Sequence, residues 1–459
     1  MKKAIITIFI INIMLISGAT SAIFAKNIEI NNEKSLYETD QKPVANWTVM
    51  YYICGETNIN DYVDDLLKNL STLGSDSNLN IVCLIDKIGH GNSKLVYIDE
   101  TGNIVNLNEE YGWPNEIDTS NLNTLGLFCT QMMQNYPAKY YGLVIFASAG
   151  IGWQGYYIGD KDGGGASSKL PDFANTLENV VNNVGHKIDV LIGSCAINMI
   201  EIAYELKSSV NYLVGTQDCL PHTHVIPMFF DAISELKNNT SLNPEGFAIK
   251  GPMHFKPVSF IYQEGYGRRI SIISKILDKL PFPKLHCVYH HSNYAAINIT
   301  MITNLTKELN ELTSYLLLSI HDNDTYCGIK KSRTTVSELG KCSAKFYILN
   351  NFFSRNPFEF LAYDCYIDLY DLIRLFKQNI PNEHIKSRCD LVLETINKTI
   401  PYVAENRDTP NCGISIYYPD AKYMYNKYKF IGKIPYPYED LKFSEDALWD
   451  EFLKEYLRK

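Results

Sequence analysis

Apolar runs and amphipathic segments alternate along the first half of the chain. Continuous apolar runs predict buried strands at Trp47–Cys54, Leu79–Asp86, Tyr140–Ser148, Ile188–Gly193 and Tyr212–Thr216. Helical spacing of apolar residues predicts helices at Asn60–Leu73, Asn123–Asn135, Leu170–Asn183 and Ala196–Ser208. Fully apolar strands joined by helices are typical of a parallel sheet covered on both faces. The sequence therefore predicts an α/β fold whose functional site lies beyond the carboxyl ends of the strands.

The pattern changes after about residue 290. A long amphipathic helix is predicted over Thr300–Ile320, a helical or strand-to-helix segment over Cys365–Phe376, a strand over Gly413–Pro419 and a closing helix over Asp446–Leu457. We expect a signal peptide at 1–25, a linker or pro-segment at 26–45, a main domain at 46–290 and a C-terminal α/β subdomain at 291–459.

The amino terminus has the features of an export signal. Two lysines precede an apolar run from Ala4 to Ala25 that ends in small residues, so we expect a cleaved signal and a secreted or extracytoplasmic protein. An uncleaved segment that anchors the chain in a membrane is the alternative. The net charge is −9 and no basic tract occurs, which argues against a nucleic-acid partner.

The cysteines and the strand ends indicate where the chemistry lies. The chain has 11 cysteines, so at least one thiol is unpaired if the others form disulfides, and Cys195 is our candidate. Cys195 follows the fourth predicted strand, and a Gly-rich segment follows the third. If these two parallel strands are neighbours, positions 149 and 195 lie side by side, as the histidine and cysteine of a Cys/His peptidase do. Position 149 is alanine.

Several segments, in order, resemble the clostripain family of cysteine peptidases, peptidase family C11. They are Trp47-Thr-Val-Met-Tyr-Tyr52, Gly55-Glu-Thr-Asn58, Gly150-Ile-Gly-Trp153, the run from Cys195 to Leu206, Asp368-Leu-Tyr-Asp-Leu372, Gly413-Ile-Ser-Ile-Tyr-Tyr-Pro419 and Trp449-Asp-Glu-Phe-Leu453. The resemblance implies a caspase-like α/β/α sandwich with a mainly parallel central sheet. It also implies a Cys/His dyad, peptide or protein substrates, and cleavage after Arg or Lys.

Two positions depart from the family pattern. The family histidine, in Asn-His-Gly-x-Gly-Trp, falls on Ala149, and the acidic residue two before the nucleophile falls on Gly193. General acid–base catalysis by such a histidine increases the reaction rate by a factor of roughly 10²–10⁴. The helix predicted to begin beside Cys195 would favour its thiolate, and the N–H groups of Gly150 and Cys195 would form the oxyanion hole that the resemblance implies. We expect an impaired or inactive peptidase homologue.

Alternatives remain open at this point. His222 or His224, after the fifth strand, would supply a relocated base for an active endopeptidase, and Asp218 would restore acidic specificity. A non-enzymatic cell-surface or peptide-binding protein is a further alternative. Trp153 is either a substrate contact or part of the core.

The polar, Gly-rich segment after Trp153 raises two further questions. The resemblance implies self-cleavage after Lys161 or Lys169, against a plain surface loop. Asp160 and Asp162 are potential Ca²⁺ ligands, but a full loop pattern is absent. The histidines and cysteine at 286–291 have metal-like spacing without a second cluster. No metal or other cofactor is therefore expected.

Overall fold

The computed structural model describes most of the chain beyond the amino terminus. The described residues are 43–56, 59–147, 149–150, 152–154, 156–157, 160, 168–193, 196–217, 225–255, 259–262, 288–291, 293–336, 366–404, 412–419, 422, 425 and 437–459. Val44–Lys459 form one compact unit. The expected signal peptide lies outside the described residues, as does most of the expected linker. Within the described ranges, no helix combines the length and the apolar character needed to cross a membrane.

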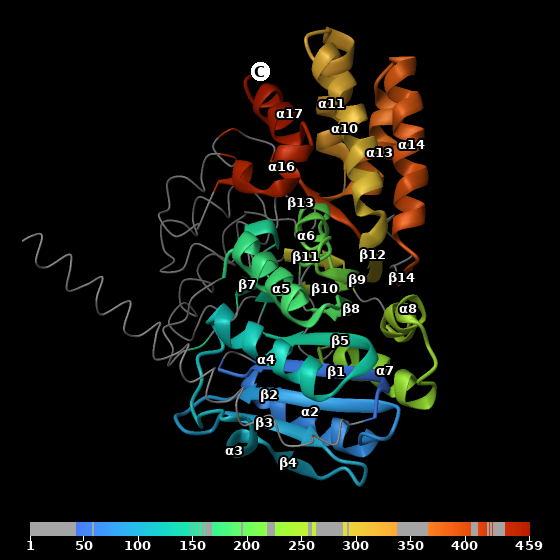
Figure 1. Cartoon of the computed structure of the whole chain (residues 1–459). Helices are drawn as coiled ribbons and strands as arrows, with labels where there is room; N and C mark the ends of the chain where they lie inside the picture. Colours follow the sequence, from blue (N-terminus) through green and yellow to red (C-terminus); the bar gives the residue numbers. More distant parts are fainter. Residues whose placement is uncertain are drawn as a thin grey trace, which may run out of the picture. The chain divides into compact units, whose positions relative to one another are not determined.

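A nine-stranded sheet is the largest sheet in the described part of the chain (Figure 1). Its order is β14 (Tyr402–Ala404), β12 (Tyr294–Asn298), β9 (Val210–Gly215), β8 (Ile188–Ile192), β5 (Ala138–Phe146), β1 (Ala45–Cys54), β2 (Leu79–Asp86), β3 (Lys94–Ile98) and β4 (Ile104–Asn106). The strands from β9 to β2 are parallel, and the two strands at each edge are antiparallel. The parallel strands are the five that the apolar runs predict.

Alternation along each strand divides the core into two layers. Met50 and Tyr52 of β1 belong to one hydrophobic cluster, and Val49 and Tyr51 belong to the other. The first cluster lies under α4 (Leu122–Asn135), α5 (Leu170–Val184) and α6 (Ile200–Glu205). The second lies under α2 (Asn60–Leu73), α7 (Val225–Asn238) and α8 (Pro244–His254). Since helices cover both faces, the predicted α/β/α sandwich is confirmed.

The carboxyl-terminal part extends the same core. Its helices are α10 (Ile302–Ser319), α11 (Asn323–Thr335), α13 (Leu369–Asn379), α14 (Glu383–Thr399), α16 (Lys442–Asp446) and α17 (Trp449–Tyr456). Leu305, Leu372 and Phe452 from these helices belong to the cluster that contains α4 and α5 side chains. Strands β12 and β14 also join the main sheet. The boundary expected near residue 290 therefore falls within a shared sheet and core.

The remaining strands and the remaining α-helix of the described residues are short. They are α3 (Asn108–Tyr111), β6 (Ala149–Gly150), β7 (Tyr156–Tyr157), β10 (Ser259–Tyr262), β11 (Val288–His291), β13 (Tyr366–Asp368) and β15 (Ser415–Tyr417). β13 runs directly into α13, which confirms the predicted strand-to-helix segment, and β13 pairs with β15 in antiparallel fashion.

Truncation of a buried side chain in a central strand tests how much core packing contributes to the stability of the fold. Leu191 in β8 is fully buried, so Leu191→Ala is expected to lower the free energy of unfolding by about 2–5 kcal/mol through lost burial and a residual cavity. Leu318→Ala is the control, because that side chain is 81% exposed, and its change should stay within about 0.5 kcal/mol. Urea unfolding measures both, and equal effects would contradict the assigned core.

Candidate active site

The candidate site begins at the ends of β5 and β8. These strands are adjacent and parallel, and Val144 of β5 is paired with Ile192 of β8. Ala149 lies three residues beyond the end of β5, and position 195 lies three residues beyond the end of β8. The expected convergence of positions 149 and 195 on one sheet edge is consistent with this register. Ser194 and Cys195 lie outside the described residues.

The turn after β8 has a strained backbone. Ala196 has φ = 53° and is the only non-glycine residue with positive φ within the described ranges. Left-handed backbone costs an L-residue roughly 1–2 kcal/mol, and such residues cluster at functional sites. The position directly after Cys195 therefore has the conformation expected of a functional turn.

The helix after this turn begins later than predicted. α6 starts at Ile200, whereas the apolar spacing predicts a helix from Ala196. Met199 is extended, with φ −118° and ψ 147°, and forms a parallel bridge with Ser415. The backbone here pairs with other segments instead of coiling. The prediction that Cys195 opens a helix is wrong, and with it the expected stabilisation of its thiolate by the dipole of that helix.

Hydrogen bonds of Asn198 connect this turn to three strands. Its side chain is fully buried, and Nδ2 donates to the carbonyl of Gly215 at 2.8 Å and to that of Ala295 at 3.2 Å. Its backbone N–H donates to Thr216 O at 3.1 Å. Its carbonyl accepts from the N–H of Ser415 at 2.9 Å and from the hydroxyl at 3.1 Å. One residue thus joins the turn to the ends of β9, β12 and β15.

Glu201, in the first turn of α6, is a buried acid. Its Oε1 accepts from the N–H of Tyr417 and from the hydroxyl of Tyr438, both at 2.8 Å. Its Oε2 has no hydrogen-bond partner among the residues that the structure describes. Burial raises the pKa of Glu201 to about 7, although the two hydrogen bonds act in the opposite direction. Glu201 therefore connects α6 to the carboxyl-terminal segment at an electrostatic cost.

The Gly-rich segment after β5 folds against the same carboxyl-terminal segment. β6 and β7 form a small hairpin in which Gly150 is paired with Tyr156. Gly152 has φ = 66°, and a Cβ there would lie 2.5 Å from the ring of Tyr366, so glycine is required. Trp153 is fully buried, with its ring centroid 5.2 Å from that of Tyr417. This burial disfavours the expected substrate contact for Trp153.

The end of β9 fixes the start of the segment that contains the alternative bases. β9 is the parallel neighbour of β8, as expected. Gln217 is fully buried, donates from its backbone N–H to Asn293 Oδ1 at 3.1 Å, and donates from Nε2 to Asp368 Oδ2 at 3.0 Å. Gly193 is buried, and its N–H donates to Val214 O at 3.0 Å. Asp218, His222 and His224 lie outside the described residues, so their roles stay predictions.

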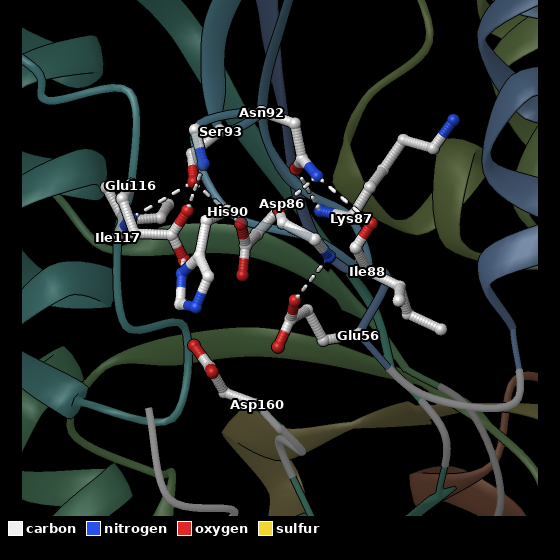
Figure 2. A network of polar contacts seen from close by, with 12 residues as sticks. Glu56, Asp86, Lys87, Ile88, His90, Asn92, Ser93, Glu116, Ile117 and Asp160 are labelled. Atoms are coloured by element: carbon white, nitrogen blue, oxygen red, sulfur yellow. Dashed lines mark hydrogen bonds and ion pairs between the residues drawn. The ribbon is translucent and has the colours of Figure 1, made fainter. Parts of the chain in front are cut away.

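Three buried carboxylates lie together beyond the ends of β1 and β2. Asp160 is buried beside Glu56 and Asp86 (Figure 2). Burial raises the pKa of Asp86 to about 7, and the carboxylates of Asp160 and Glu56 add to the rise. Sequence reasoning found Asp160 but missed the other two. The available signal was an acid at the end of one apolar strand, Asp86, and an acid two residues beyond the end of the adjacent strand, Glu56.

Of the two expected cleavage positions, the structure describes Lys169. Lys161 and Asp162 lie outside the described residues. Lys169 directly precedes α5 and is partly buried, and its carbonyl accepts from the N–H of Phe173. Cleavage after either lysine stays a prediction.

Comparison with known proteins assigns the family. A protein-family model described as the clostripain family matches residues 51–456. The chain belongs to the clostripain family. No curated protein sequence gives a significant match.

Solved clostripain-family structures share the fold. An inactive zymogen C11 protease from Parabacteroides distasonis has a TM-score of 0.55 at 14% identity, over 88% of this chain and 98% of that chain. A secreted C11 cysteine protease from Bacteroides thetaiotaomicron, in complex with an irreversible peptide inhibitor, has a TM-score of 0.56 at 13% identity, over 89% and 100%. Another structure of a secreted C11 cysteine protease from that organism, given the name iotapain, has a TM-score of 0.51 at 14% identity, over 88% and 99%.

Family membership sets the class of chemistry. Clostripain-family proteins have a cysteine-peptidase scaffold, so peptides or proteins are the relevant class of substrate. The likeness to the solved structures shows that this chain has the caspase-like sandwich fold. At these sequence identities the likeness supports the fold alone.

An isosteric change at Asn198 tests the anchoring of the turn. Asn198→Asp removes both Nδ2 donors and faces a buried carboxylate with two carbonyl oxygens, so the free energy of unfolding should fall by about 3–5 kcal/mol. Asn135→Asp is the control, because Asn135 Nδ2 makes one exposed bond to Gln131 O, and a loss within about 1 kcal/mol is expected. Denaturant unfolding measures both, and an unchanged Asn198→Asp variant would refute the anchoring role.

Glu201 predicts a specific pH dependence of stability. Its folded pKa is about 7 against an ordinary 4.5, so as the pH rises the unfolded chain loses the proton first. The wild-type chain therefore loses stability between about pH 4.5 and 7. The free energy of unfolding of Glu201→Gln, relative to wild type, should rise by about 2–3 kcal/mol from pH 4 to pH 8.

Urea unfolding at several pH values measures this difference. Glu100→Gln provides the same chemical change at an exposed position and should follow the wild-type profile. Parallel profiles for Glu201→Gln and wild type would show that the buried carboxyl does not titrate as described.

Proposed function

We propose that this chain is an exported clostripain-family peptidase homologue that binds extended peptides but cleaves them poorly or not at all. Ala149 stands at the position of the general-base histidine. The observation that supports this role for position 149 is the pairing of β5 with β8 in parallel register, which directs both chain exits to one sheet edge. Cys195 is the nucleophile in this proposal.

The chemistry explains why cleavage is impaired. A free thiol has a pKa near ~8.5, so little thiolate exists at neutral pH without an adjacent imidazolium. α6 begins at Ile200 and does not supply the helix N-terminus that was expected at Cys195. The leaving amine also lacks a proton donor. The backbone N–H groups of Gly150 and Cys195 would still bind a carbonyl oxygen, so peptide binding and slow acylation by activated esters remain.

Specificity at the site also differs from the family pattern. Gly193 offers no carboxylate for a basic side chain at the position where the family has an acid. Asp218 follows the anchored residue Gln217 and would restore a negative charge at the same sheet edge. We infer a weak preference for Lys or Arg peptides that depends on Asp218.

A second candidate function is an active endopeptidase with a relocated base. β9 is next to β8, and Gln217 fixes the point where the 218–224 segment leaves the sheet. His222 or His224 would then approach Cys195 from the neighbouring strand end. This candidate predicts turnover that depends on one of these two histidines.

Export is proposed from the amino-terminal segment. The run from Ala4 to Ala25 has the composition of a signal peptide, and a structural relative with this fold is secreted. Processing after Lys161 or Lys169 would follow export, and an uncut chain between residues 159 and 170 would suit an inert state.

Labelling of Cys195 discriminates between the two functions. The purified chain is treated with a peptidyl acyloxymethyl ketone that ends in Lys or Arg, and the second-order labelling rate is measured by mass spectrometry. Ala149→His should raise this rate by about 10²–10⁴ because it restores the proton acceptor and donor. Cys195→Ala should abolish labelling in both backgrounds.

The opposite results would be equally clear. Rapid labelling and peptide turnover by the wild-type chain, lost in His222→Ala or His224→Ala, would establish the relocated base. No gain in folded Ala149→His would refute the assignment of position 149 to the base.

A further inference from the structure

A buried polar network lies directly beside the turn that follows β8. Gly193 N–H donates to Val214 O at 3.0 Å, and Asn198 N–H donates to Thr216 O at 3.1 Å. Both ends of the turn that contains the expected nucleophile are therefore bonded to the end of β9. Gln217 is the next residue along the chain, so it lies at the edge of the candidate active site.

Three side chains form this network, and each is at most 1% exposed. Gln217 N–H donates to Asn293 Oδ1 at 3.1 Å, and Asn293 Nδ2 donates back to Gln217 Oε1. Gln217 Nε2 then donates to Asp368 Oδ2 at 3.0 Å. Because Asn293 Oδ1 accepts from the backbone, Asn293 faces the Gln217 amide with Nδ2, and the Gln217 amide is oriented in turn. The donors and acceptors therefore have one order, which ends at the carboxylate of Asp368.

Asp368 has a role beyond capping α13. Its Oδ1 accepts from Asp371 N–H at 2.9 Å, which is the cap, and its Oδ2 also accepts from Cys412 N–H at 2.8 Å. Asparagine caps a helix as well as aspartate does, but only a carboxylate offers acceptors alone to the two donors at Oδ2. Burial raises the pKa of Asp368 to about 6, and the Asp371 carboxylate adds to the rise, although the hydrogen bonds act in the opposite direction. Burying this acid is costly, which indicates that the contacts of Oδ2 matter.

We propose that Asp368, acting through Gln217, is a positioning residue that sets the affinity of the candidate active site for peptides. The inference rests on the proposed function, which assigns peptide binding to this sheet edge. β8 lies between β9 and β5 in the sheet (Figure 1), so the network adjoins the site on the side opposite position 149. It therefore acts on the segment that begins at Asp218, where the preference for Lys or Arg is proposed, and not on proton transfer at position 149.

The concentration dependence of Cys195 labelling tests the assignment. A peptidyl acyloxymethyl ketone that ends in Lys gives KI for reversible binding and kinact for the chemical step, in wild type and in the Ala149→His background. Asp368→Asn keeps an oxygen for the α13 cap but turns an NH₂ group toward the two donors. KI should therefore rise at least about tenfold, while kinact should change by less than about twofold.

A control and a second variant separate positioning from loss of structure. Asp322→Asn is the matched control, because Asp322 is an exposed N-cap of α11 that accepts from Thr325 N–H, and it should leave both constants unchanged. Gln217→Met removes the intermediate amide and adds no buried charge. It should raise KI as Asp368→Asn does, and the double variant should raise KI no further, since both changes break one chain of hydrogen bonds.

Hydrogen exchange provides a readout that needs no labelling. Gln217 N–H and Cys412 N–H are each bonded to a side chain of the network. In Asp368→Asn their exchange should accelerate at least about tenfold. The amides of β1 and β5 should exchange as in wild type, which establishes that the variant folds.

The opposite results would overturn the proposal. They are an unchanged KI in folded Asp368→Asn, additive effects in the double variant, and unchanged exchange at Gln217 and Cys412. Equal changes in KI and kinact would likewise contradict a role confined to peptide affinity. Absence of Cys195 labelling in both backgrounds would instead refute the proposed function, and hydrogen exchange would still decide whether Asp368 orders the backbone at Gln217.

Discussion

The buried amide of Asn198 is the interaction on which the candidate site depends. The carbonyls of Gly215 and Ala295 lie at adjacent strand ends, where the regular ladder stops, and one Nδ2 group satisfies both. A carbonyl buried without such a donor costs about 1–3 kcal/mol. Gly215 permits the close approach, because a Cβ there would lie 2.3 Å from Ile197. The left-handed turn at Ala196 is therefore held by contacts on the sheet side and does not need a helix behind it.

The carboxyl-terminal part completes the site from the other side. Ser415 pairs with the backbone of Asn198, and Tyr417 and Tyr438 satisfy Glu201. Asp368 accepts from Gln217 at the end of β9 and from the N–H of Cys412 at 2.8 Å, and burial raises its pKa to about 6. The buried acids that make these contacts are Glu201 of α6 and Asp368 of β13. The family match over residues 51–456 is consistent with one cooperative unit.

Sequence patterns predicted the centre of the fold better than its edges or its polar contacts. Strands buried on both faces give continuous apolar runs, so the five parallel strands were recognisable, and α2 was predicted with its observed bounds. The edge strands β4 and β14 are short and partly exposed and have no long apolar run, and the run in β3 extends only from Leu95 to Ile98. The start of α6 was missed because Ala196, Ile197 and Met199 are apolar at helical spacing, whereas Asn198 and Met199 pair with Thr216 and Ser415. Tertiary pairing overrode local spacing there.

The carboxylates of Glu56, Asp86 and Asp160 are far apart in sequence, and only the fold brings them together.

In our proposal the chain binds peptides but turns them over poorly. The strained residue Ala196, the buried acid Glu201 and the carboxylates near Asp86 each cost stability. Hydrogen bonds from their surroundings offset part of these costs. The sequence has alanine instead of a proton acceptor at position 149, and the nearby acid Glu201 accepts hydrogen bonds from Tyr417 and Tyr438. In the proposed function, a turn held by these hydrogen bonds but without the base would bind a peptide carbonyl at backbone N–H groups, yet it would not protonate a departing amine.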